Sequence, residues 1–169
     1  TYNDFVEASA LSCLRQDYGA FHLYLLDDST EQRSRDRVDA FAERNAGRVT
    51  VVRRPDREGF KAGNLNHALS GVAREPVFAL VDADEVLPSD FLSRTVPRLV
   101  ADPGCGFVQA NHESNPDTEG ALPLAMGIGI DIHWRWYQPL RNDYGFVMLL
   151  GHGAVVRREA WESVGGFPP

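Results

Sequence analysis

Hydrophobic positions along the chain follow two spacings, one typical of helices and one typical of strands. Phe5, Ala8 and Leu11 lie on one face of a helix predicted over residues 4–16. Short apolar runs between turn residues predict strands. The first spacing predicts helices at residues 4–16, 32–45, 61–73, 88–100, 121–140 and 158–164. The second predicts strands at residues 21–27, 48–54, 76–82, 106–111 and 152–158.

The alternation of strands and helices predicts an α/β fold. Strand–helix–strand units at this spacing imply crossover connections and a mostly parallel sheet flanked by helices. In such sheets, ligands bind beyond the carboxyl ends of the strands. One predicted strand ends in Asp27 and Asp28, and a later one ends in Asp82 and Asp84. Both acid pairs are therefore expected to face one crevice.

Composition narrows the class of protein. The 169 residues, 43% hydrophobic and 24% charged, are typical of one soluble globular domain. The net charge of −7 argues against nucleic-acid binding, which needs a basic surface. No apolar run approaches the ~20 residues of a membrane span, and no segment is expected to be a signal peptide. Cys13 and Cys105 lack metal-ligand spacing and are expected to be free thiols.

The turn Asp82-Ala83-Asp84 is a candidate metal site. Neighbouring carboxylates repel each other, and a divalent cation relieves that repulsion. Mg²⁺ binds oxygen at ~2.0–2.1 Å and typically uses one or two carboxylates plus substrate phosphates. A helix cap with solvated neighbours is the alternative for these acids. Glu85, next in the chain, is expected to face solvent or a neighbouring loop.

Other segments offer groups that suit a nucleotide. Asp27 and Asp28 can accept hydrogen bonds from ribose hydroxyls or a base N–H, although a plain turn would also explain them. Lys61, the only lysine, opens a predicted helix, where a cation suits an anionic group. A solvated surface lysine is the alternative reading of Lys61.

Aromatic residues and histidines give a weaker signal. The helical spacing of Trp134, Trp136 and Tyr137 predicts that they pack in the core, with stacking on an acceptor sugar as the alternative. His112 follows a predicted strand and is expected near the crevice.

In this order along the chain, the motifs resemble family 2 glycosyltransferases. The similarity rests on Thr1-Tyr2-Asn3, Asp27-Asp28-Ser29, Lys61-Ala62-Gly63-Asn64-Leu65-Asn66, Asp82-Ala83-Asp84, Gln109, Arg157-Arg158-Glu159-Ala160 and Val164-Gly165-Gly166-Phe167. The box that begins at Lys61 resembles the cellulose-synthase-like branch. The likeness covers essentially the whole chain, and the motifs are specific in combination rather than singly.

The resemblance implies a GT-A, Rossmann-like fold and a metal-dependent, inverting transfer of sugar. The implied donor is a nucleotide-diphosphate sugar of the UDP type, and the acceptor is a saccharide, a lipid-linked molecule or another hydroxyl compound. Mg²⁺ or Mn²⁺ would be held by Asp82 and Asp84. The residues implied to bind the nucleotide sugar are Thr1, Tyr2, Asp27, Asp28, Lys61, Asn64, Asp82 and Asp84.

The resemblance also implies how the chain is organised. Residues 1–169 would form a single domain, with the nucleotide-sugar-binding part at 1–113 and the start of the acceptor-side part at 114–169. The parent protein would be membrane-associated and would make polysaccharide, with this soluble part on the cytoplasmic face. Membrane contact would come only through other parts of that parent.

Two departures from the family pattern concern the ends of the chain. The family's first strand would precede Thr1, and its general base would follow Pro169. An inverting transfer needs such a base to accept the proton of the acceptor hydroxyl. The fragment is therefore expected to lack it, and His152, Asp131 and His133 are expected to be structural.

Two other functions stay open from the residues alone. In a phosphatase of the haloacid dehalogenase type, Asp82 would attack phosphorus and Asp84 would act as acid and base. A catalytically silent fragment that binds a nucleotide is the second alternative.

Overall fold

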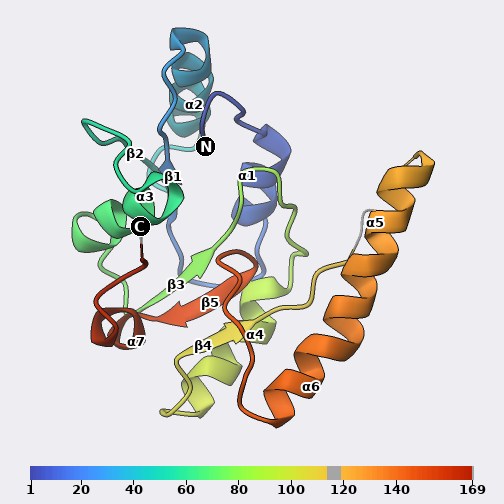
Figure 1. Ribbon diagram of the computed structural model, residues 1–169. Coiled ribbons are helices and arrows are strands. Elements are labelled where there is room, and N and C mark those ends of the chain that lie inside the picture. The colour runs from blue at the N-terminus through green and yellow to red at the C-terminus, as the bar shows by residue number, and fades with distance from the viewer. Residues whose placement is uncertain (114–118, 169) are drawn as a thin grey trace.

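The computed structural model describes residues 1–113 and 119–168, in which helices and short strands alternate (Figure 1). The elements are α1 (Glu7–Leu14), β1 (Leu23–Leu26), α2 (Gln32–Arg44), β2 (Val49–Val52), α3 (Phe60–Ser70), β3 (Val77–Leu80), α4 (Phe91–Ala101), β4 (Phe107–Gln109), α5 (Ala121–Ile132), η1 (His133–Tyr137), α6 (Gln138–Asp143), β5 (Ala154–Arg157) and α7 (Arg158–Ser163). The predicted α/β class is confirmed, with element ends that differ by a few residues. The division predicted at 113/114 falls beside residues 114–118, which, like Pro169, lie outside the described residues.

The described strands form two small sheets. β1 and β2 pair in parallel, as predicted, with Leu23 opposite Val49. β5 lies between β3 and β4 and runs antiparallel to both. The end of β4 pairs with the start of β5, Gln109 opposite Ala154, so the intervening segment returns to the same edge of the sheet. Both pairs of this three-stranded sheet are thus antiparallel, whereas the sequence predicts a mostly parallel sheet.

An apolar cleft of about 750 Å³ separates the two sheets. Residues of β1 and residues of β3 both line it. Among the described strands, these two are not hydrogen-bonded to each other. The extra strand that the sequence predicts stays a prediction.

Three groups of buried side chains hold the elements together. The first joins α1, α2 and β2, and in it Val38 and Phe41 have no exposed surface. The second packs α4 against β5 through Leu99 and Val155, and the third packs α7 against β3 through Trp161. Each fully buried aliphatic or phenyl side chain contributes about 1.5–3 kcal/mol relative to an exposed one. Residues of β3 take part in both the second and the third group.

The pair Arg157 and Arg158 satisfies the carboxyl ends of two helices. The last carbonyls of a helix lack intrahelical partners. Arg157 Nη2 donates to the Leu99 carbonyl at 2.7 Å, beside the end of α4. Arg158 donates to the carbonyls of Leu69 at 2.9 Å and Ala73 at 2.5 Å, at the end of α3. The Arg-Arg motif therefore ties α3 and α4 to the end of β5.

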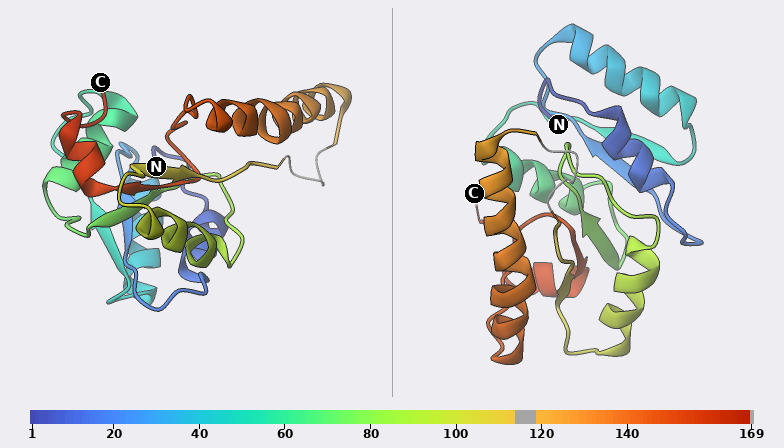
Figure 2. Two further views of the ribbon diagram at one scale, coloured as in Figure 1. Left: turned by 90° about the horizontal axis from the view of Figure 1, so that it is seen from below. Right: turned by 90° about the vertical axis from the view of Figure 1, so that its right-hand side faces the viewer.

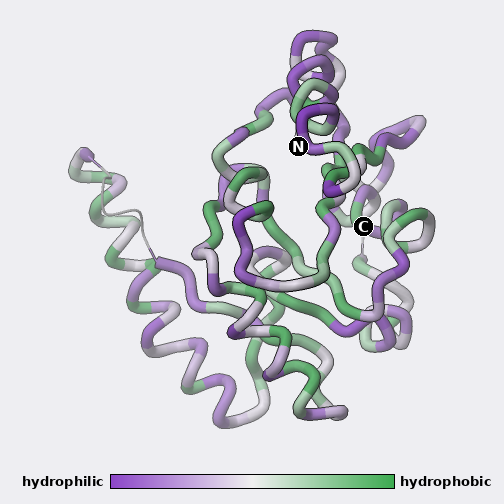
Figure 3. Tube along the Cα trace, turned by 180° about the vertical axis from the view of Figure 1, so that it is seen from behind, coloured by the Kyte–Doolittle hydropathy of each residue, from purple (hydrophilic) through white to green (hydrophobic). Residues whose placement is uncertain are grey.

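The elements α5, η1 and α6 form one helical rod that stands beside the sheets (Figures 1 and 2). Its first half is hydrophobic (Figure 3), and Leu122, Met126 and Ile128 are exposed there. In the part of the chain that the structure describes, no helix is long and apolar enough to cross a membrane.

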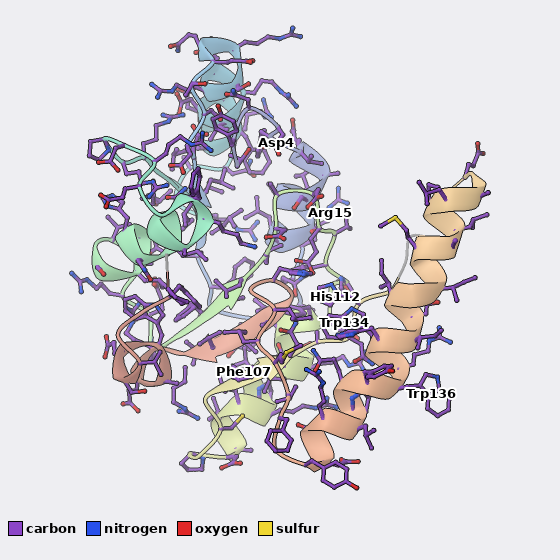
Figure 4. All side chains as sticks on the ribbon, viewed as in Figure 1. Asp4, Arg15, Phe107, His112, Trp134 and Trp136 are labelled. Carbon is purple, nitrogen blue, oxygen red and sulfur yellow. The ribbon has the colours of Figure 1, made fainter. Side chains whose placement is uncertain are left out.

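The aromatic residues of the rod divide between core and surface. Trp134 is buried, as predicted, and stacks on His112 with ring centroids 4.3 Å apart. Trp136 is 72% exposed and points away from the body (Figure 4). Tyr137 is exposed as well. The prediction that all three pack in the core was wrong for Trp136 and Tyr137, because the residues of a helix point in different directions and only the side of the rod that carries Trp134 is buried here.

Candidate functional site

The mouth of the apolar cleft gathers most of the predicted nucleotide-binding residues. The predicted residues that line the cleft are Thr1, Tyr2, Asp28, Lys61, Asn64 and Asp82. Asp28 follows β1 and Asp82 follows β3, so the expectation that the two acid-bearing strand ends share a crevice is confirmed for these two. Asp27 and Asp84 are not among the residues that line it.

Asp27 is buried, and its side chain links the end of β1 to the end of β2. Arg53 Nε donates to Asp27 Oδ2 at 2.8 Å, and the Ser29 N–H donates to Asp27 Oδ1 at 3.0 Å. Burial raises the pKa of Asp27, but the hydrogen bonds from Ser29 and the Arg53 guanidinium outweigh burial and hold the pKa below its usual value. Both carboxylate oxygens of Asp27 are therefore engaged within the protein.

Asp28 and Arg54 shape the turn that leads into α3. Arg54 donates to both Asp28 oxygens, at 2.9 Å and 2.7 Å, in a bidentate ion pair. The same guanidinium donates to the carbonyls of Glu58 at 2.5 Å and Phe60 at 2.8 Å. A side chain at Gly63 would meet this turn, since an added Cβ would lie 2.0 Å from the Glu58 oxygen. The glycine of the Lys61 box is thus required for close packing.

Lys61 and Asp82 form an ion pair across the cleft mouth. Lys61 lies in the first turn of α3, and its Nζ contacts Asp82 Oδ1. The two side chains are 54% and 34% exposed. Exposed ion pairs contribute only about 0–1 kcal/mol, so a charged ligand can replace this pair at little cost.

Two buried polar atoms at the cleft have no hydrogen-bond partner within the described residues, namely Arg57 Nε and Asn64 Oδ1. The Arg57 guanidinium lies 3.6 Å from the centre of the Tyr2 ring, and Arg57 Nε is 4.0 Å from Asp28 Oδ2. Buried polar groups are nearly always paired, so these atoms are candidates for ligand contacts. Sequence reasoning missed Arg54 and Arg57, although an arginine cluster after the second strand was visible in the sequence.

Asp84 and Glu85 diverge from their shared turn. Asp84 is exposed, and its side chain has no hydrogen bond or ion pair within the described residues. Glu85 points inward, and its Oε2 accepts a hydrogen bond from the Asp82 N–H at 3.2 Å. Of the two alternatives expected for Glu85, the neighbouring loop is correct. Burial raises the pKa of Glu85.

The Glu85 side chain lies close to two histidines. Its Oε1 lies 3.7 Å from His112 Nδ1 and 3.8 Å from His152 Nδ1. Within the described residues, these three side chains are the one group of three or more histidines, cysteines or acids arranged to hold a metal ion. Burial, and next the neighbouring His152, lower the pKa of His112 to about 4. The predicted pair Asp82 and Asp84 is not part of this group.

The other singled-out residues have structural contacts. Asn66 Oδ1 accepts hydrogen bonds from the Phe167 N–H at 2.9 Å and from Trp161 Nε1 at 3.2 Å, which joins the Lys61 box to the Gly-Gly-Phe segment. Asp131 and His133 lie on the rod and do not line the cleft.

Comparison with known proteins identifies relatives over most of the chain. The profile of the family described as Glycosyl transferase family 2 matches residues 1–165. Cellulose synthase 2 of Novacetimonas hansenii is 30% identical over 99% of this chain and 11% of its own length. Glucomannan 4-beta-mannosyltransferase 9 of Arabidopsis thaliana is 30% identical over 86% of this chain and 28% of its own length. The chain therefore spans between about a tenth and somewhat over a quarter of these relatives.

Proposed function

The chain belongs to glycosyl transferase family 2, and from this premise we propose that the cleft mouth binds the nucleotide diphosphate of a UDP-type sugar donor. One observation carries the proposal. The exposed Lys61–Asp82 ion pair lies on the same cleft as two buried polar atoms without partners, Arg57 Nε and Asn64 Oδ1. The family match also favours glycosyl transfer over the phosphatase alternative.

The cations at the mouth suit the diphosphate. Lys61 lies at the amino end of α3, an 11-residue helix whose dipole favours an anion there. Arg57 is the second cation that lines the cleft. A diphosphate would take Lys61 from Asp82 and free that carboxylate for a metal ion. Because the ion pair is exposed, this exchange costs at most about 1 kcal/mol.

The remaining lining groups suit the nucleoside. Tyr2 presents an aromatic ring on which a base can stack, with Arg57 already against it. Thr1, Asp28 and the Asn64 Oδ1 atom offer acceptors for ribose hydroxyls or a base N–H. Asp28 is better placed than Asp27 for this contact because it lines the cleft. Asp27 would act by holding Arg53 and the end of β2.

The oxygen donors at the end of β3 fit Mg²⁺ or Mn²⁺. Asp84 is exposed and has no competing partner among the described residues, while Asp82 shares only its Oδ1 with Lys61. Together with diphosphate oxygens, two such carboxylates meet the usual requirements of these cations. When bound, the metal would stabilise the negative charge that develops on the leaving diphosphate.

The proposed reaction transfers the sugar to a hydroxyl acceptor with inversion. The acceptor oxygen would form a bond to the anomeric carbon as the bond to the diphosphate breaks, and a general base would take the hydroxyl proton. None of the described residues is assigned that role. The names of the relatives support a saccharide acceptor and polysaccharide synthesis. A membrane-associated parent with this part on its cytoplasmic face stays a prediction.

Calorimetry of nucleotide binding tests the proposal. UDP, GDP and dTDP are titrated into the wild type with and without Mn²⁺, and the series is repeated on Asp84→Ala and Asp143→Ala. Asp143 is an exposed acid at the end of α6, so it serves as a control. We expect UDP to bind most tightly, with Mn²⁺ dependence lost only in Asp84→Ala. Equal binding in both variants would overturn the metal assignment.

A separate assay of UDP-sugar hydrolysis distinguishes the enzyme from the silent fragment. Metal-dependent UDP binding without any turnover would support a nucleotide-binding fragment. Absence of nucleotide binding altogether would overturn the proposed donor site.

A further inference from the structure

We propose that Glu85, His112 and His152 form a second cation site, which takes a borderline transition metal of the Zn²⁺ class and lies beneath the donor site. The three residues come from separate segments: the turn after β3, the segment after β4 and the loop before β5. Two imidazoles and one carboxylate are a ligand set that Zn²⁺ prefers, whereas Mg²⁺ prefers oxygen alone. This site is chemically distinct from the oxygen-only pair Asp82 and Asp84.

The spacing of the ligand atoms supports a bridging ion. The candidate atoms of the three side chains lie within 4.8 Å of one another. Glu85 Oε1 is 3.7 Å from His112 Nδ1 and 3.8 Å from His152 Nδ1, which is too long for direct hydrogen bonds. Zn²⁺ bonds of about 2.0–2.1 Å place tetrahedral ligand atoms about 3.3–3.4 Å apart. Small side-chain shifts would therefore close the site around an ion.

Neighbouring side chains hold the histidines in place. Trp134 stacks on His112, with rings 15° from parallel and centroids 4.3 Å apart (Figure 4). Gln109 Nε2 donates to the carbonyls of His152 at 2.8 Å and Gly153 at 3.0 Å. Outer contacts of this kind orient ligands around a metal and tune its affinity. The site is thus supported from β4 and from the rod.

Gly153 allows the ligands to approach each other. Its φ is +56°, and an added Cβ would lie 2.4 Å from His112 Nε2 and 2.8 Å from Glu85 Oε1. A larger residue would displace both ligands. Glycine at this position therefore satisfies the backbone conformation and the space that the site requires.

An ion bound at this site would affect the turn at Asp82 in the donor site through Glu85. While Oε1 of Glu85 faces the histidines, its Oε2 accepts the Asp82 N–H at 3.2 Å. A cation that fixes this carboxylate would also fix the backbone at Asp82. Three protein ligands leave one position of a tetrahedral ion for water.

Metal titration without any nucleotide tests the site. The 169-residue chain is stripped with a chelator and titrated with Zn²⁺ by calorimetry, and Co²⁺ serves as a spectroscopic probe of coordination. The variants are Glu85→Gln, which keeps the shape of the side chain, and His152→Asn. His67→Asn is the matched control, because His67 is exposed on α3 and outside the group. Circular dichroism confirms that each variant is folded.

We expect one Zn²⁺ per wild-type chain and affinity at least ~10-fold lower in both ligand variants, since even outer-contact changes cost 10–100-fold. His67→Asn and Asp84→Ala should bind Zn²⁺ as the wild type does, and the Co²⁺ absorption of a low-coordinate site should vanish in His152→Asn. Failure of the wild type to bind Zn²⁺, or wild-type affinity in Glu85→Gln and His152→Asn, would overturn the proposal. Neither result depends on whether the donor site binds a nucleotide.

Discussion

Replacement of Gly63 by alanine should destabilise the fold by crowding the turn before α3. The added Cβ would lie 2.0 Å from the Glu58 carbonyl oxygen and 2.7 Å from Arg54 Nη1. These two atoms are hydrogen-bonded to each other, and Arg54 is also paired with Asp28. Neither atom can therefore move away alone.

The size of the effect follows from two losses and one gain in stability. Overpacking typically costs about 1–3 kcal/mol, and loss of a hydrogen bond from a charged group costs about 1.5–3 kcal/mol. The helix propensity of alanine returns about 1 kcal/mol. The net loss in the free energy of unfolding should be about 1.5–5 kcal/mol, which corresponds to a fall in Tm of about 3–20 °C.

Urea unfolding followed by circular dichroism measures this change. Gly129→Ala is the matched control, since Gly129 also lies within a helix but has no atom within 4 Å of its added Cβ. That variant should gain up to about 1 kcal/mol from helix propensity alone. A Gly63→Ala protein as stable as the wild type would refute the crowding at the turn.

Three further predictions concern buried and ion-paired groups. Burial raises the pKa of Cys13 to about 11 from 9.0, so at pH 8 the thiolate of Cys13 is about 100-fold scarcer than it would be at the ordinary pKa. Alkylation of Cys13, followed by mass spectrometry, should therefore be much slower than that of the half-buried Cys105. Arg158→Met leaves helix-end carbonyls unpaired and should cost about 2–3 kcal/mol in urea unfolding, whereas the exposed Arg98→Met should cost little. The folded-state pKa of Asp27 is lowered, so the ionised carboxylate stabilises the fold above the ordinary pKa near ~4, and this stabilisation is lost as pH falls through the folded pKa. The loss of stability with falling pH should therefore be less steep in Asp27→Asn than in the wild type. Identical pH profiles of the two proteins would contradict this.

Much of the candidate site could be predicted because its residues lie at the ends of local elements. Apolar spacing placed the strands, and the rule for the ends of parallel strands brought Asp28 and Asp82 to one crevice. The rule could not decide between Asp27 and Asp28, because adjacent residues of a strand point to opposite sides and only packing determines which side is buried. Arg57 was missed because a basic residue in a turn has no periodic signal.

The sequence by itself determined the elements, their order, the family and the strand-end acids, since hydrophobic spacing and turn residues act between near neighbours in the chain. Tertiary structure decided the direction of β5, the exposure of Trp136 and the inward turn of Glu85. It also brought Glu85 together with His112 and His152. These features depend on contacts between segments far apart in the chain, whose geometry is set by how the sheet, the rod and the loop before β5 pack together.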